Sequence, residues 1–244
     1  MPRKHLIASG INKKQQMQAK IWMKLAKEIK AAAKVGGPNP EANPRLKAAI
    51  DKALQNNLSR ESIDKNINGS QKDASALMDL EYEGYGPNGL GVIVKALTDN
   101  ENRTVSALRG YFTKLDGKIA KQNSVKTNFN YSGEIILDKE NLTEDKLMEV
   151  IFNIIETLNA TEEPIENTIE NEDCFQVITN PKYFYKIRDQ IQKELKVISS
   201  EIKYIPNDYV NLSQDEFNKL ERFLNQCEDD DDIQWVITNF GEVE

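Results

Sequence analysis

Apolar side chains in the N-terminal part of the chain recur with the period of an α-helix. Between residues 12 and 34 they return every fourth position, at Met17, Ile21, Leu25 and Ile29. This spacing predicts one long amphipathic helix, which the Gly36–Pro38 segment ends. Asn43 with the proline after it, and then Ser59, predict the starts of a second and a third helix. The N-terminal part is therefore expected to be all-helical.

After residue 78 the pattern changes to short runs in which apolar and polar positions alternate, separated by helical stretches. The predicted strands cover residues 80–82, 91–97, 124–131, 134–137, 175–179, 198–205 and 233–237. The predicted helices cover residues 102–115, 143–158, 181–195 and 213–224. The last of these helices begins at a capping box made by Ser213 and Glu216. Such a mixture of elements predicts an α+β fold.

The order of these elements predicts three domains. Residues 1–78 form an N-terminal three-helix domain, residues 79–132 with 206–244 form a discontinuous α+β domain, and residues 133–205 form an α+β domain inserted into it. The insertion follows because the single helix and strand after residue 206 cannot build a domain alone. They can, however, complete the second domain, and we expect both α+β domains to be ferredoxin-like.

Charge is divided unevenly between these parts. The whole sequence has 32 Lys+Arg and 39 Asp+Glu, a formal net charge of −7. Residues 1–78 hold 15 basic and 6 acidic side chains, so 15 − 6 = +9, whereas residues 79–244 hold 17 and 33, so 17 − 33 = −16. This division favours contact with a polyanion through the N-terminal domain, with the acidic remainder facing away.

The basic residues of the first predicted helix form a row. From Lys13 to Lys34 a lysine recurs every seven residues, and Lys24 lies one turn from two members of the row. Seven residues are nearly two helical turns, so these ammonium groups share one face. An ordinary solvated helix face mixes basic and acidic side chains. Because this row is entirely basic, binding to nucleic-acid phosphates is the favoured interpretation. The predicted nucleic-acid contacts are Arg3, Lys4, Lys13, Lys14, Lys20, Lys24, Lys27, Lys34, Arg103 and Arg109.

Helices two and three suggest a helix-turn-helix, in which the third helix would enter a DNA groove. That helix mixes Arg60 and Lys65 with Glu61 and Asp64, which makes a poor recognition surface. A small packing bundle is the favoured interpretation.

A glycine-rich segment joins the first two predicted strands. Its candidate loop residues are Gly84, Tyr85, Gly86, Pro87, Asn88 and Gly89. The spacing matches the G-x-G-x-x-G pattern of nucleotide-binding loops, but such a loop passes from a strand into a helix. Here Pro87–Gly89 is turn chemistry between two strands, so we predict a constrained hairpin-like loop.

The sequence lacks the residues that several kinds of catalytic and metal-binding site require. His5 is the single histidine, so it cannot build a histidine metal cluster or a catalytic triad, and no Walker loop occurs. Cys174 and Cys227 are expected to be reduced, buried thiols. The acidic run Glu228–Asp232 lacks the spacing of a calcium loop and is expected to be a solvated turn. We predict a non-enzymatic protein without catalytic residues, metal, cofactor or small-molecule substrate. With no apolar run long enough to cross a membrane, a cytoplasmic location is expected.

Longer stretches of the chain resemble the YebC-like proteins, a family of bacterial regulators that includes mitochondrial translational activators of cytochrome oxidase. The stretches are Lys27–Ile29, Ala31–Lys34, Gly36–Gly37, Pro40–Asn43, Leu46–Ile50, Tyr82–Gly89, Leu97–Asn100, Asn102–Thr104, Ser124–Val125 and Glu228–Gln234. The likeness spans essentially the whole chain. The N-terminus departs from the family pattern at Lys4–Ile7 and Ala19–Trp22, where a tryptophan-containing start and a Lys-Arg pair are usual.

The resemblance implies the same three-domain layout and a role in gene expression. It implies either a DNA-binding transcriptional regulator or a ribosome-associated translation factor that assists elongation or relieves stalling. We expect the first of these. In the second, the protein would bind ribosomal RNA and its glycine loop would reach toward that RNA. A third hypothesis is a scaffold that holds a partner protein. No feature of the sequence assigns an oligomeric state.

Overall fold

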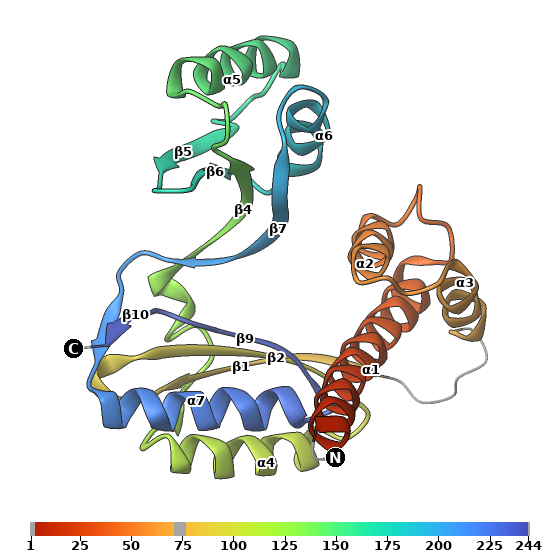
Figure 1. The fold of residues 1–244 in the computed structure, drawn as a ribbon, viewed down its shortest axis with the longest axis vertical. Coiled ribbons are helices and arrows are strands. Elements are labelled where there is room, and N and C mark those ends of the chain that lie inside the picture. The colour runs from red at the N-terminus through yellow and green to blue at the C-terminus, as the bar shows by residue number, and fades with distance from the viewer. Residues whose placement is uncertain (1–2, 71–76, 244) are drawn as a thin grey trace. The chain divides into compact units, whose positions relative to one another are not determined.

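The structure, a computed structural model, describes residues 3–70 and 77–243, with side chains from residue 17 onward. The chain folds into two compact units (Figure 1). The first unit is formed by Met1–Val125 together with Val210–Glu244, and the second by Lys126–Tyr209. Each unit has a core of its own, so each is described separately below.

Three helices build the N-terminal part of the first unit, as predicted. They are α1 (Arg3–Gly36), α2 (Pro44–Gln55) and α3 (Arg60–Gly69). Their shared core contains Leu25, Ile29, Ala32, Ala33, Leu46, Ala49, Ala53, Leu58, Ile63 and Ile67. Helix α1 begins nine residues earlier than the apolar spacing predicted, at Arg3 rather than near residue 12.

Asn43 fixes the connection between α1 and α2. Its side-chain oxygen accepts a hydrogen bond from the backbone N–H of Leu46 at 3.1 Å, which caps α2. Its amide group donates to the carbonyls of Ala32 at 2.8 Å and Gly37 at 2.9 Å. Gly37 has a φ of 86°, a left-handed conformation that glycine adopts without strain. One polar side chain thus satisfies the end of α1 and the start of α2.

A four-stranded antiparallel sheet forms the rest of the first unit. Its strands are β1 (Met78–Tyr85), β2 (Gly91–Thr98), β3 (Lys118–Ile119) and β9 (Ile233–Thr238), in the spatial order β3-β1-β2-β9. The helices α4 (Glu101–Lys114) and α7 (Gln214–Asp229) cover one face of it (Figure 1). The short strands β8 (Val210–Leu212) and β10 (Phe240–Val243) pair in parallel. Val92, Val94, Leu108, Phe112, Leu220, Phe223 and Cys227 pack between sheet and helices.

The second unit has the chain order βαββαβ. Its elements are β4 (Phe129–Asp138), α5 (Glu144–Leu158), β5 (Ile165–Glu170), β6 (Cys174–Thr179), α6 (Phe184–Glu194) and β7 (Val197–Pro206). The spatial order β5-β6-β4-β7 is that of a ferredoxin-like fold. Two one-turn 3-10 helices, Pro87–Gly89 in the first unit and Lys126–Asn128 in the second, complete the description.

The α+β fold class is confirmed, with two antiparallel four-stranded sheets. The predicted inserted domain, residues 133–205, lies within the second unit, and the three-domain division itself stays a prediction. In the first unit the sheet starts with the β1–β2 hairpin, so its chain order differs from βαββαβ.

In place of the two strands predicted at 124–131 and 134–137 there is one strand, β4, and the prediction is wrong for residues 124–128, which precede that strand as a bend and a 3-10 turn. Strand β4 runs through Gly133 without a break. Glycine is needed there because a Cβ would lie 2.2 Å from the Phe184 ring.

Candidate nucleic-acid interface

The predicted contacts of α1 divide into two groups. Arg3, Lys4, Lys13 and Lys14 belong to the first half of the helix, whose backbone is helical but whose side chains lie outside the described residues. Lys20, Lys24, Lys27 and Lys34 lie in the second half, whose side chains are described. Apart from Lys34 in the last turn, the members of this second group turn toward α7 rather than toward open solvent.

Three lysines of α1 contact the carboxyl end of α7 and the segment after it. Lys20 forms an ion pair with Asp229. Lys24 Nζ donates to the backbone carbonyl of Glu228 at 2.9 Å, and Lys27 Nζ donates to that of Asp231 at 3.1 Å. We name residues 20, 24 and 27 the lysine triad and residues 228–232 the acidic segment.

The expectation that the acidic part of the chain faces away from the lysine row is therefore wrong for the acidic segment. The physical reason is local. The carboxyl end of a helix presents carbonyl groups without an intrahelical partner and a partial negative charge, so it attracts ammonium groups. The carboxylates that follow strengthen this attraction. The partners are 203 to 209 residues apart in sequence, so no local sequence pattern could have predicted the contact.

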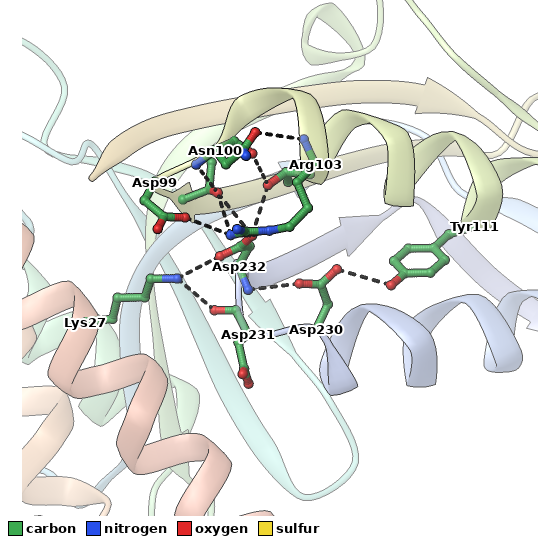
Figure 2. A network of polar contacts seen from close by, with 10 residues as sticks. Lys27, Asp99, Asn100, Arg103, Tyr111, Asp230, Asp231 and Asp232 are labelled. Atoms are coloured by element: carbon green, nitrogen blue, oxygen red, sulfur yellow. Dashed lines mark hydrogen bonds and ion pairs between the residues drawn. The ribbon is translucent and has the colours of Figure 1, made fainter. Parts of the chain in front are cut away.

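Asp232 is the centre of the contact (Figure 2). Its side chain is 10% exposed, and Lys27 Nζ lies 2.9 Å from Oδ1. On the other oxygen, Oδ2 accepts hydrogen bonds from Thr98 Oγ1 at 3.0 Å, from Thr104 Oγ1 at 3.1 Å and from Arg103 Nη2 at 2.6 Å. The carboxylate thereby joins α1, the start of α4 and the start of β9.

The environment of Asp232 favours its ionised form. Burial alone would raise the pKa of this carboxyl group, but hydrogen bonds from Arg103 and Lys27 together outweigh burial and lower the pKa to about 2. The pKa of Arg103 is raised, first by the hydrogen bond to Asp232 and then by the one to Asp99. Arg103 was predicted to contact nucleic acid, whereas in the structure its guanidinium group is held by these two carboxylates.

The neighbouring groups extend the network. Asn100 caps α4 by accepting from the backbone N–H of Arg103 at 3.1 Å. Tyr111 donates its hydroxyl to Asp230 at 3.1 Å, and burial, with Asp230 beside it, raises the pKa of Tyr111 to about 12 (Figure 2). Burial also lowers the pKa of Lys24 and raises that of the Cys227 thiol to about 12. Together these groups form a dense polar junction, at whose centre Lys27 and Arg103 share the Asp232 carboxylate.

Arg109 is an exposed residue of α4, for which the structure gives no side-chain ion pair. Lys34 is exposed in the last turn of α1. Of the six predicted contacts whose side chains are described, Lys20, Lys24, Lys27 and Arg103 are held by acidic residues or by carbonyls at the end of α7, and the prediction for the other four stays untested.

The glycine-rich segment is the predicted hairpin-like loop. Strand β1 leads through the 3-10 turn Pro87–Gly89 into strand β2 and not into an α-helix, so the arrangement is not that of a nucleotide-binding loop. Asn88, with a φ of 53°, donates its side-chain amide to Glu216 at 3.0 Å. The loop is thus held against the start of α7.

Glu83 and Gly84 explain the first part of this segment. The carboxylate of Glu83 is buried and accepts from the backbone N–H groups of Asn123 at 2.6 Å and Val125 at 2.7 Å, which fixes the loop after β3. Gly84 is needed because a Cβ would lie 2.3 Å from a ring carbon of Phe112. The contacts within the first unit therefore explain why Glu83 and Gly84 occupy these positions.

Comparison with known proteins places the chain in a family. The sequence model of the TACO1/YebC N-terminal domain matches residues 2–73, and the model of the TACO1/YebC second and third domains matches residues 77–240. The chain belongs to the TACO1/YebC family.

Relatives of similar length support this membership. A probable transcriptional regulatory protein of Malacoplasma penetrans is 69% identical and covers 100% of this chain and 99% of its own length. The probable transcriptional regulatory protein YrbC of Bacillus subtilis is 37% identical, over 94% of this chain and 93% of YrbC. The crystal structure of a conserved hypothetical protein of Aquifex aeolicus has a TM-score of 0.76 at 31% identity, and covers 93% of this chain and 91% of that one.

The polar junction unites separate stretches that resemble the TACO1/YebC family. Leu97–Asn100 and the adjacent Asn102–Thr104 lie far in sequence from Glu228–Gln234, and the three stretches meet around Asp232. The side chains of these stretches bind one another, so these family-like residues form a contact within the chain.

Sequence reasoning missed the roles of two acidic residues. The acidic segment was expected to be a solvated turn, which is wrong for Asp232, because this residue is only 7% exposed. Its position directly before the apolar strand β9 is the one signal that separates it from its exposed neighbours. Glu83 gave no such signal, since its partners lie 40 and 42 residues away.

Other expectations have simple outcomes. Cys227 is buried and Cys174 is half-buried, and both are free thiols. Among the described side chains, those of residues 17–70 and 77–243, no group of three or more His, Cys, Asp or Glu is placed to hold a metal ion. No helix in this part of the chain is long and apolar enough to cross a membrane.

Proposed function

We propose that this member of the TACO1/YebC family is a non-enzymatic nucleic-acid-binding regulator of gene expression, and that it acts as a DNA-binding transcriptional regulator. The observation that carries the proposal is α1, one continuous helix of 34 residues. It holds nine Lys+Arg and one acidic residue, Glu28, so 9 − 1 = +8. The names of the relatives, probable transcriptional regulatory proteins, support the same function.

The first half of α1 is the proposed primary contact. Its basic residues are Arg3, Lys4, Lys13 and Lys14, and it has no acidic residue. Among the described side chains of α1, Ile21 packs against the core of the helical domain and Leu25 is part of it.

Phosphate contact predicts a strong salt dependence. If about four phosphates are neutralised, the slope of log affinity against log salt concentration is about −3.6. Affinity then falls roughly 100-fold between 50 and 200 mM salt. Contacts of this kind position a protein on nucleic acid and carry little sequence information.

The test is a titration of labelled 20-base-pair DNA with the full chain, followed by fluorescence anisotropy at several salt concentrations. The variant Lys13→Glu/Lys14→Glu is expected to bind at least tenfold more weakly and to reduce the slope by about 2. The control variant Lys186→Glu/Lys193→Glu changes two exposed lysines in the second unit and has the same net charge. Equal losses in both variants, or no binding by the unaltered protein at low salt, would overturn the proposal.

A ribosome-bound translation factor is the second candidate function. It is favoured by the mixed charge of α3, which holds Arg60 and Lys65 together with Glu61 and Asp64, because this helix offers no evident surface for reading bases. Binding through phosphates alone suits ribosomal RNA as well as DNA. Gradient sedimentation of cell extracts separates the two candidates. Salt-sensitive migration with ribosomes and absence from DNA supports this one, and the reverse supports transcriptional control.

A further inference from the structure

We propose that the acidic segment is an internal competitor for nucleic acid, which occupies the lysine triad until a polyanion displaces it. The inference rests on the proposed function and adds its regulation. Two states are implied: a closed state, in which α1 contacts the end of α7 as in this structure, and an open state, in which the triad is available to phosphates.

The acidic segment offers the triad the kind of ligand that a phosphate chain offers. Lys20 pairs with the Asp229 carboxylate, Lys24 binds two carbonyl oxygens, and Lys27 binds one carbonyl and one carboxylate. An ammonium group has three N–H donors, so a lysine held by two oxygens must release them to grip a phosphate well. The five acidic side chains of the segment would also repel a phosphate chain that approached the closed triad.

The ion pairs between the lysine triad and the acidic segment differ in how exposed they are to solvent. Lys20 and Asp229 have side chains that are 39% and 71% exposed, and such exposed pairs contribute little to stability. Lys27 and Asp232 are 23% and 10% exposed, within the polar junction. Opening is therefore expected to begin at Lys20, with Asp232 still bound to Arg103.

Packing beneath the contact leaves room for this motion. A cavity of about 230 Å³ lies beside Lys24, lined also by Leu224, Cys227 and Gln234. Gln234 Nε2 is buried and has no hydrogen-bond partner in the described part of the chain. Helix α1 does not depend on α7 to stay folded, because Leu25 and Ile29 are buried in the core shared with α2 and α3.

A matched pair of variants on α7 tests the competition. Glu228→Gln/Asp229→Asn removes two charges from the acidic segment, and Asp215→Asn/Glu221→Gln removes two exposed charges from the same helix away from the triad. Both pairs raise the net charge equally, so a general field effect strengthens DNA binding equally. We expect the first variant to bind labelled DNA about tenfold more tightly than the unaltered protein, and the second no more than about twofold.

A second measurement follows the contact itself. Carbodiimide links an amine to a carboxylate in direct contact, so it should join Lys20 to Asp229 in the full chain, and mass spectrometry can quantify the linked peptide. Saturating DNA is expected to lower this yield at least threefold. The pair Lys182–Glu162, 3.1 Å apart and exposed in the second unit, serves as the control and should be unchanged.

The outcomes separate this inference from the proposed function. Normal DNA binding with an unchanged Lys20–Asp229 yield, or with equal effects of the two α7 variants, overturns the competition and leaves DNA binding intact. No binding of DNA or RNA at low salt, even by Glu228→Gln/Asp229→Asn, overturns both. Two results together support both proposals: tighter DNA binding by Glu228→Gln/Asp229→Asn but not by the second α7 variant, and a lower Lys20–Asp229 crosslink yield in the unaltered protein when DNA is bound.

Discussion

Replacing Asp232 by asparagine should destabilise the first unit of the protein. The substitution keeps the shape of the side chain but removes the charge that Lys27 and Arg103 share. It also turns an amide donor toward groups that already donate, Thr98 and Thr104 among them. The polar junction would then contain two cations without their common anion.

The magnitude follows from the environment of the carboxylate. A pKa of about 2 instead of the usual 3.8 corresponds to about 2.4 kcal/mol in favour of the ionised form in the folded protein. Removing one partner of a fully buried pair costs about 3 to 5 kcal/mol, and this pair is less buried, because Arg103 is 54% exposed. We expect Asp232→Asn to lower the free energy of unfolding by about 2 to 3 kcal/mol at pH 7.

The pH dependence has a definite sign. Because the pKa of Asp232 is lowered in the folded state, its contribution to stability is complete above the unfolded value of 3.8. The contribution is lost as the pH falls through about 2, because below that pH the carboxyl group is protonated in both states. The difference in stability between the unaltered protein and Asp232→Asn should therefore be constant from pH 7 to about 5 and shrink between about pH 4 and 2.

Urea unfolding followed by tryptophan fluorescence measures this difference. Both tryptophans, Trp22 and Trp235, lie in the first unit, so the signal reports the unit that contains the junction. Asp231→Asn is the matched control: it removes an exposed charge from the neighbouring position and should change stability by less than about 0.5 kcal/mol. Identical unfolding midpoints for the two variants at pH 7 would refute the role given to Asp232.

Three further predictions concern packing, capping and thiol reactivity. Gly84→Ala should cost about 1 to 3 kcal/mol, because its methyl group would lie 2.3 Å from a ring carbon of α4, whereas Gly110→Ala, with open space, should stabilise that helix by about 0.5 to 1 kcal/mol; urea unfolding compares them. Asn43→Ala should lower thermal stability through loss of the α2 cap, by about 1 kcal/mol or more, and an unchanged melting temperature would contradict this. Cys227, buried and with a pKa raised to about 12, should be alkylated more slowly than half-buried Cys174, as mass spectrometry at pH 8 can show.

Local structure was predictable because it depends on residues that are close in sequence. The four-residue apolar spacing of α1, the caps Asn43 and Ser59, and the capping box at Ser213 each act within one helical turn. The glycine-rich segment was recognised as a hairpin-like loop from its turn chemistry alone. These features needed no knowledge of the rest of the chain.

The sequence by itself determined a basic first helix and an acidic remainder. Only the tertiary structure decided that the two meet: Lys27 lies beside Asp232, and Lys24 beside the carbonyl of Glu228, across more than 200 residues. Periodicity and capping act over a few residues, whereas this contact depends on where β9 and α7 lie in the folded unit. Burial then assigned different roles to adjacent acids of the same type, because Asp232 is enclosed by donors while Asp231 is exposed to solvent.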